Sequence, residues 1–139
     1  MEKRVKILHS RRQRKSIEEK WQNPVLNSIR HSFLVKNSGK IQSLKIWIYD
    51  FANGLGWLNP WGNIQAFVYD DQQNKIAESE VLPADSSIKN KVLVLKFSNS
   101  ANLEENKTYD FEIVFSGFQA NVKRSSNNEP YFIITGSKN

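Results

Sequence analysis

Residues 41–70 constrain the fold of this chain more than any other stretch, because they contain two runs with an apolar residue at every second position. The apolar positions are Leu44, Ile46 and Ile48 in the first run, and Ile64, Ala66 and Val68 in the second. A period of two is that of a pleated strand, whose successive side chains point to opposite faces. The pattern predicts two strands, with Trp47 and Tyr49 on the opposite face of the first.

A segment rich in Gly, Asn and Trp separates these two runs. Gly54, Gly56, Pro60 and Gly62 exclude regular structure there, whereas Trp57 and Trp61 are costly to leave in water. A loop that keeps its aromatic residues either packs them beneath itself or presents them to a ligand. The sequence leaves both interpretations open.

The rest of the chain after residue 30 reads as further short strands and turns. Strands are predicted at residues 32–36, 75–82, 92–98, 108–116 and 130–135, with a short one at Val122, a turn at 71–74 and a loop at 83–87. The only helix expected is a short one at 17–21, behind a capping box of Ser16 and Glu19. This pattern indicates an all-β, antiparallel β-sandwich of the jelly-roll type.

The length of 139 residues suits one domain, and we divide the chain into an arm (1–30) and a β-sandwich (31–139). The net charge of +6 belongs to the arm. Residues 16–139 carry 13 basic and 13 acidic side chains, whereas the first fifteen residues hold one glutamate and seven cations: Lys3, Arg4, Lys6, Arg11, Arg12, Arg14 and Lys15. Charges of one sign this close together repel, so a partner of opposite sign is expected to order them.

Several classes of protein are disfavoured by what the chain lacks. It has no cysteine, hence no disulfide, thiolate metal site or cysteine nucleophile. It has no run of about 18 apolar residues, so we expect no membrane span. It has no signal peptide, so we expect synthesis in the cytoplasm and a final location in a virion or outside the cell. His9 and His31 lack zinc-ligand spacing, and the neighbouring pairs Glu18–Glu19 and Glu104–Glu105 cannot face each other as acid and base. We therefore expect no enzyme.

The aromatic residues within and beside residues 41–70 are the best candidates for a ligand site. One face of a sugar ring is lined by C–H bonds, which a flat aromatic ring matches, while nearby amides and carboxylates bond its hydroxyls. The candidates are Trp47, Tyr49, Asp50, Asn53, Trp57, Asn59, Trp61 and Gln65. The alternative is that these rings cap the core, with the face of Trp47 and Tyr49 covered by the other sheet.

Four segments carry a resemblance to a known family. They are Ser32-Phe33 with GKIQSL at 39–44, FVYD at 67–70 with NKIAES at 74–79, VLKF at 94–97, and Leu103 with NKTYDF at 106–111. In this order they resemble the jelly-roll modules that act as carbohydrate-binding domains in bacterial secreted enzymes and phage tail proteins. The resemblance implies a β-sandwich and a carbohydrate ligand, although this fold hosts many functions. Asn106 stands where such modules usually have glycine, and asparagine tolerates the same left-handed backbone.

A second resemblance lies at the front of the chain. Residues 4–7 and 21–26 (RVKI and WQNPVL) are similar to the start of some phage tail-fibre and baseplate proteins, without their usual glycine–acid continuation. The basic arm can also neutralise phosphates of a nucleic acid, as the arms of several jelly-roll coat proteins do. It has no interleaved aromatics for base stacking, and an acidic partner or a membrane surface fits it equally.

No cofactor is expected, apart from a structural calcium ion at Asp70, Asp71 and Asn74, whose oxygens suit that ion. A tight turn requires the same residues without a metal.

The sequence thus predicts a non-catalytic β-sandwich that binds carbohydrate around Trp47, Trp57 and Trp61, as a homo-oligomer or part of a phage tail or adsorption structure that supplies avidity. The alternative is a structural virion coat or assembly subunit, whose arm contacts nucleic acid or a partner subunit.

Overall fold

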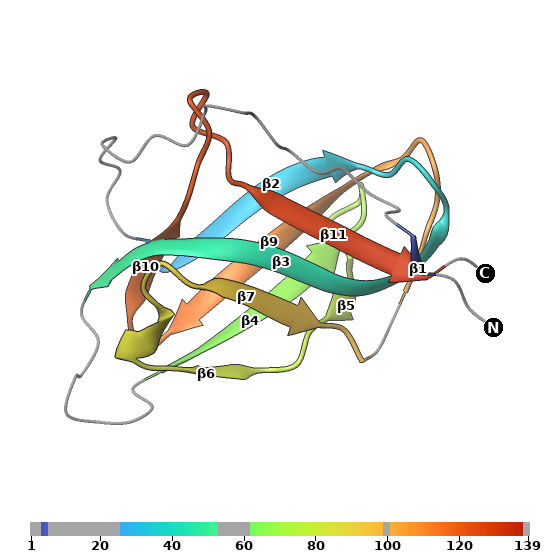
Figure 1. The fold of residues 1–139 in the computed structure, drawn as a ribbon. Helices are drawn as coiled ribbons and strands as arrows, with labels where there is room; N and C mark the ends of the chain where they lie inside the picture. The colour runs from blue at the N-terminus through green and yellow to red at the C-terminus, as the bar shows by residue number, and fades with distance from the viewer. Residues whose placement is uncertain (1–3, 6–25, 53–61, 99–100, 138–139) are drawn as a thin grey trace.

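Two antiparallel sheets pack face to face in the computed structural model, which describes residues 4–5, 26–52, 62–98 and 101–137 (Figure 1). The first sheet has the order β1 (Arg4–Val5), β11 (Phe132–Ser137), β3 (Gly39–Ala52) and β10 (Gln119–Val122), with β7 (Val92–Lys96) and β8 (Asn102–Leu103) also paired to β3. The second has the order β2 (Ser28–Leu34), β9 (Thr108–Ser116), β4 (Gly62–Tyr69) and β5 (Lys75–Glu78), with β6 (Leu82–Ala84) also paired to β4. The predicted all-β sandwich is confirmed.

The path of the chain alternates between the two sheets. The strands that flank residues 53–61, β3 and β4, belong to opposite sheets, and β7 returns to β3 after β5 and β6 have paired with β4. A jelly roll folds in this way, since its strands cross repeatedly from one sheet to the other. Among the described residues the helical structure is a single 3-10 turn, η1 (Ser86–Ile88), and no helix is long and apolar enough to cross a membrane.

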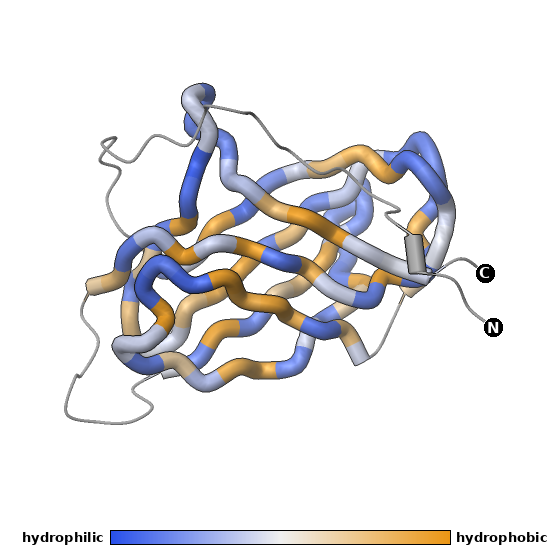
Figure 2. The backbone as a smooth tube through the Cα atoms, in the orientation of Figure 1, coloured by the Kyte–Doolittle hydropathy of each residue, from blue (hydrophilic) through white to orange (hydrophobic). Residues whose placement is uncertain are grey.

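The core lies between the sheets and consists of the residues that the period of two selects. On β3 Leu44, Ile46 and Ile48 are fully buried, and on β9 the alternate residues from Tyr109 to Phe115 are buried as well. Figure 2 shows the resulting alternation of hydrophobic and hydrophilic residues along the strands. The rings of Phe111 and Phe132 join the two sheets edge to face, with centroids 4.8 Å apart. The period of two that the sequence shows in β3 and β4 is confirmed, and its apolar face is the buried one.

Strand ends differ from the sequence predictions in several places; the strand predicted at 92–98, for example, ends at Lys96, and the one predicted to end at 135 continues to Ser137. The first strand runs over Ser28–Leu34 instead of 32–36, because β2 pairs with β9 along its whole length and buries Ile29 beside Phe33. The strand predicted at 75–82 stops at Glu78, and the predicted loop at 83–87 includes the end of β6 and then η1. The last strand begins at Phe132 instead of 130. The helix predicted at 17–21 lies outside the described residues.

Ser79 explains the break between β5 and β6. Its hydroxyl accepts a hydrogen bond from the amide of Ala66 (2.9 Å) and donates one to the carbonyl of Glu80 (2.8 Å). The Ala66 amide of β4 thus bonds to a side chain in place of a ladder carbonyl, and the bond to Glu80 competes locally with the ladder. Pro83 is tolerated in β6 because β6 pairs with β4 alone among the described strands, which leaves one edge that needs no amide donor.

Two predicted turns have the expected backbone. Asn106 has a φ of 67°, the left-handed conformation that asparagine tolerates. In the β4–β5 hairpin the Asp70 carboxylate accepts hydrogen bonds from the amides of Gln72 (2.9 Å) and Asn74 (2.8 Å). The Asp70 side chain therefore organises this turn, as its sequence predicts.

The Asp70 turn is expected to make stability depend on pH in acid. The hydrogen bond from the Asn74 amide, followed by that from Gln72, holds the pKa of Asp70 below its ordinary value. A lowered folded pKa contributes stability above the unfolded pKa of about 4, and this contribution is lost as the pH falls through the folded pKa. Urea unfolding should therefore show wild type more stable than Asp70→Asn at pH 7, with the difference shrinking below about pH 3. An equal difference at both pH values would contradict this.

Candidate functional site

Trp47 and Tyr49 lie on the outward side of β3. Both are half-buried, whereas their neighbours Ile46 and Ile48 are fully buried in the core. The opposite sheet packs against the inward side of β3, so it does not cover these two rings. The structure thus decides between the two alternatives that the sequence left open for this face.

Apolar side chains from the adjacent strands extend the surface around Trp47. Val92 of β7 pairs directly with Trp47, while Val94 of β7 and Ile133 of β11 lie on either side of Lys45. Val92 and Val94 are 45% and 38% exposed, which is unusual for valine in a paired strand. We call Trp47, Val92, Val94 and Ile133 the apolar platform. Strand residues in register form a flat surface, which suits a flat ligand.

A polar hollow of about 390 Å³ adjoins the platform. Tyr49 and Asp50 of β3 line it, together with Lys89 and Asn90 of the turn before β7 and Lys123, which follows β10. We call it the lysine hollow. Its volume falls in the usual range for small-ligand sites, of about 300–1,000 Å³.

Backbone hydrogen bonds fix both sides of the lysine hollow to β3. The amide of Ile48 donates to the carbonyl of Lys91 (2.9 Å), and the amide of Lys123 donates to the carbonyl of Trp47 (2.8 Å). The turn that carries Lys89 is anchored by buried Ile88, and Asn90 allows it to reverse with a left-handed φ of 59°. The hollow therefore stands on a paired strand with short, bonded connections.

Lysines dominate the charge of the hollow. The Lys89 ammonium lies 3.7 Å from a carboxylate oxygen of Asp50, beyond the 2.7–2.9 Å of a strong charge-assisted hydrogen bond. That same oxygen accepts the amide of Phe51 at 2.9 Å, which orients the carboxylate. Among the described residues no acidic side chain lies within salt-bridge distance of Lys123. One carboxylate thus stands against two ammonium groups.

The outward side of the other sheet is already occupied by its own cations. The Arg30 guanidinium lies over the Tyr69 ring at 4.1 Å, and the Lys75 ammonium lies over the Phe67 ring at 4.4 Å. Burial, followed by the hydrogen bond that the Tyr69 hydroxyl donates to Glu112 (3.0 Å), raises the pKa of Tyr69. In the part of the chain that the structure describes, no cation lies over the Trp47 ring in this way. Trp47 thus differs from Tyr69 and Phe67 in having no cation over its ring among the described residues.

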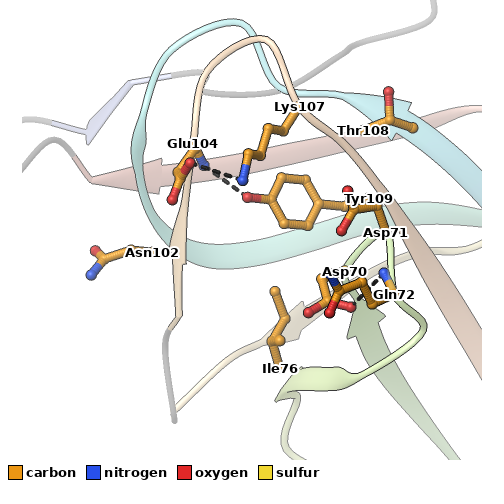
Figure 3. A pocket seen from close by; sticks show the side chains of 9 residues that line it. All are labelled: Asp70, Asp71, Gln72, Ile76, Asn102, Glu104, Lys107, Thr108 and Tyr109. Atoms are coloured by element: carbon orange, nitrogen blue, oxygen red, sulfur yellow. Dashed lines mark hydrogen bonds and ion pairs between the residues drawn. The ribbon is translucent and has the colours of Figure 1, made fainter.

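A second hollow, of about 290 Å³, lies at the β4–β5 turn and the turn before β9 (Figure 3). Lys107 pairs with Glu104 at 3.1 Å, and the Tyr109 hydroxyl accepts the Glu104 amide at 3.0 Å. Asp70 is engaged by its own turn. The groups that line this second hollow are thus largely bonded to one another.

The calcium ion considered at Asp70, Asp71 and Asn74 finds little support at this hollow. No group of three or more His, Cys, Asp or Glu residues with metal-binding geometry occurs within residues 4–5, 26–52, 62–98 and 101–137. Because Asp70 oxygen already accepts two backbone amides, the hairpin accounts for these residues without an ion.

The structure brings together three of the predicted ligand residues, Trp47, Tyr49 and Asp50, and separates a fourth. Gln65 lies on β4 in the opposite sheet, where its amide donates to the carbonyl of Ser79 at 2.8 Å. Four candidates lie outside the described residues: Asn53, Trp57, Asn59 and Trp61. Of the cationic arm, Arg4 belongs to β1 and pairs with β11, and the other six cations lie outside the described residues as well.

Sequence reasoning missed Lys89, Asn90 and Lys123. They stand in a turn and just after a short strand, where no periodicity marks a face, and the chain separates them from Tyr49 by forty residues or more. The available signal was local: two lysines flank Asn90, a residue that favours turns. The His31 ring, for which the sequence indicates no zinc-ligand spacing, lies 5.7 Å from that of Phe132 and 6.2 Å from that of Phe111.

Comparison with other proteins adds no assignment to this geometry. No protein-family model, no curated protein and no solved structure matches the chain.

Proposed function

We propose that this protein is a non-catalytic binding module that takes carbohydrate on the apolar platform and in the adjoining lysine hollow. A sugar ring would lie with its C–H face on Trp47, and the polar groups of the hollow would bond its hydroxyls.

The outward, half-buried position of Trp47 carries this proposal. The ring stands on the longest strand of the fold, with Val92 beside it and the Tyr131 ring 6.1 Å away at a tilt of 56°. A site on a paired strand is held in place before a ligand arrives, which lowers the entropy lost on binding. The polar groups needed for orientation are close by, since Tyr49 and Asp50 follow Trp47 on the same strand.

Replacing Trp47 with alanine is expected to weaken carbohydrate binding at least about tenfold, or about 1.4 kcal/mol, as truncation of a central aromatic residue commonly does. The wild-type protein is first applied to a glycan array, and the glycan that binds best is then titrated by calorimetry into both proteins.

Phe67→Ala provides the matched control for that measurement. Phe67 is also a half-buried aromatic on the outward side of a central strand, but in the opposite sheet. Its loss should leave affinity within about twofold, and thermal unfolding shows whether both variants are folded. A wild-type protein that binds no glycan, or a folded Trp47→Ala protein that binds as well as wild type, would overturn the proposal.

The exposed valines favour one second candidate, a structural subunit that uses the same platform to contact a partner protein. Exposed aliphatic residues beside an aromatic ring are common at protein interfaces. Size-exclusion chromatography separates the two functions: an assembly subunit should elute as an oligomer that Trp47→Ala dissociates, whereas a carbohydrate module keeps its elution volume in that variant.

A further inference from the structure

The lysine hollow has a charge that the carbohydrate proposal does not by itself require. Neutral sugars are usually oriented by amides, hydroxyls and carboxylates, whereas two of the five lining residues here are lysines. Residues 16–139 have no net charge, so this local excess does not follow from a generally basic body.

Charges of opposite sign are concentrated at different parts of the sandwich. The second hollow is lined by three carboxylates, Asp70, Asp71 and Glu104, against the single cation Lys107 (Figure 3). On the β3 side, Lys45 of β3 and Lys96 of β7 alternate with the platform residues and add to the lysines of the hollow. A surface with this separation of charge attracts anions to one side.

Asp50 neutralises only part of the lysine charge. Its contact with Lys89, at 3.7 Å, joins two side chains that are each about half exposed (55% and 48%). Such a pair is screened by water and contributes little, so the Lys89 ammonium can exchange Asp50 for another anion at small cost. Lys123 is half-buried and is held to β3 by its own backbone, which places a second ammonium at the hollow.

We propose that the saccharide bound at this site is acidic, with a carboxylate or sulfate group held between Lys89 and Lys123 while a ring of the same saccharide lies on Trp47. This inference rests on the proposed carbohydrate function and names the class of its ligand. The lysines distinguish acidic from neutral saccharides, and Trp47 supplies contact area to both.

Matched ligands test the charge. The full-length protein is titrated with dextran sulfate and with dextran, which share a glucan backbone, and with oligogalacturonate and its methyl ester, which differ only in carboxylate charge. Wild type is expected to bind at least one acidic member about tenfold or more tightly than its neutral counterpart, with affinity falling as salt is raised. The two pairs show whether sulfate or carboxylate is preferred.

The double variant Lys89→Gln/Lys123→Gln is expected to lose much more of that preference and of the salt dependence than its control does, while its affinity for the neutral member stays within about twofold. Its control is Lys36→Gln/Lys40→Gln, which also removes two positive charges, but from exposed positions away from the hollow. Lys40 lies at the opposite end of β3, nine residues or about 30 Å from Tyr49. Both variants keep the basic arm and lose two positive charges, so any binding of a polyanion to the arm changes by the same amount in each. The difference in affinity between the two variants therefore reports the lysine hollow alone.

The outcomes separate this inference from the proposed function. Equal binding of neutral and acidic members, or equal losses in the two double variants, overturns the acidic-ligand inference and leaves carbohydrate binding in place. Failure of every saccharide to bind, on the array and in these titrations, overturns both. A preference lost only in Lys89→Gln/Lys123→Gln supports the inference.

Discussion

Replacing Phe111 with alanine is expected to destabilise the fold by about 3–5 kcal/mol, the usual range for truncating a buried phenylalanine. Phe111 is fully buried on β9. Its ring stacks against Phe33 of β2, with centroids 6.1 Å apart, and meets Phe132 of the opposite sheet edge to face. The substitution therefore removes contacts within one sheet and across the core. Domains of this size are stable by about 5–15 kcal/mol in total, so the variant should be close to unfolding.

Urea unfolding, followed by tryptophan fluorescence, measures this effect. Leu34→Ala is the control, because Leu34 lies on β2 in the same sheet but is 44% exposed. The control should change the free energy of unfolding by no more than about 0.5 kcal/mol. A Phe111→Ala protein within about 1 kcal/mol of wild type would mean that the two sheets do not depend on this aromatic contact.

Replacing Gly62 with alanine is expected to lower the free energy of unfolding by about 1–3 kcal/mol. The cause is crowding by the added methyl group, whereas Phe111→Ala leaves a cavity. A Cβ atom at this position would lie 2.3 Å from the carbonyl oxygen of Ser116 and 2.8 Å from the ring of Phe118. The Ser116 oxygen is part of the backbone of β9, which pairs with β4 at this point through Asn63. Since a backbone atom in a ladder cannot rotate away, the strands must separate or β4 must shift.

The neighbouring exposed residue provides the control for Gly62. Asn63→Ala changes a side chain that faces solvent one residue further along β4, and should alter stability by no more than about 0.5 kcal/mol. Thermal and urea unfolding of both variants give the comparison. If Gly62→Ala unfolds at the same urea concentration as wild type, β9 has room to yield at the start of β4.

Gly62 also shows where local sequence signals mislead. In the sequence it looks like one more loop glycine among Gly54 and Gly56. In the structure it begins β4 and allows β9 and the Phe118 ring to approach closely. Close approach is a second reason for glycine in a strand, and only the neighbouring chain reveals which reason applies.

Alternation predicted which residues of β3 and β4 share a face, because a pleated strand places every second side chain on one side whatever surrounds it. Turn-forming residues predicted the β4–β5 hairpin for a similarly local reason, whereas the left-handed backbone of Asn106 was expected only from the resemblance stated above. Strand ends were predicted less well, since pairing with a distant partner sets them, as β9 does for Ser28 and Ile29. The carbohydrate ligand and the role of the basic arm are still predictions.

The candidate site likewise combines features that the sequence determined with features that depend on the tertiary structure. The sequence by itself determined that Trp47 and Tyr49 share a face of one strand. Only the tertiary structure decided that this face points away from the core, that Gln65 belongs to the opposite sheet, and that Lys89 and Lys123 flank Tyr49. The physical reason is that side-chain alternation is a property of one strand, whereas the partner of a strand depends on hydrogen bonds between segments far apart in the chain.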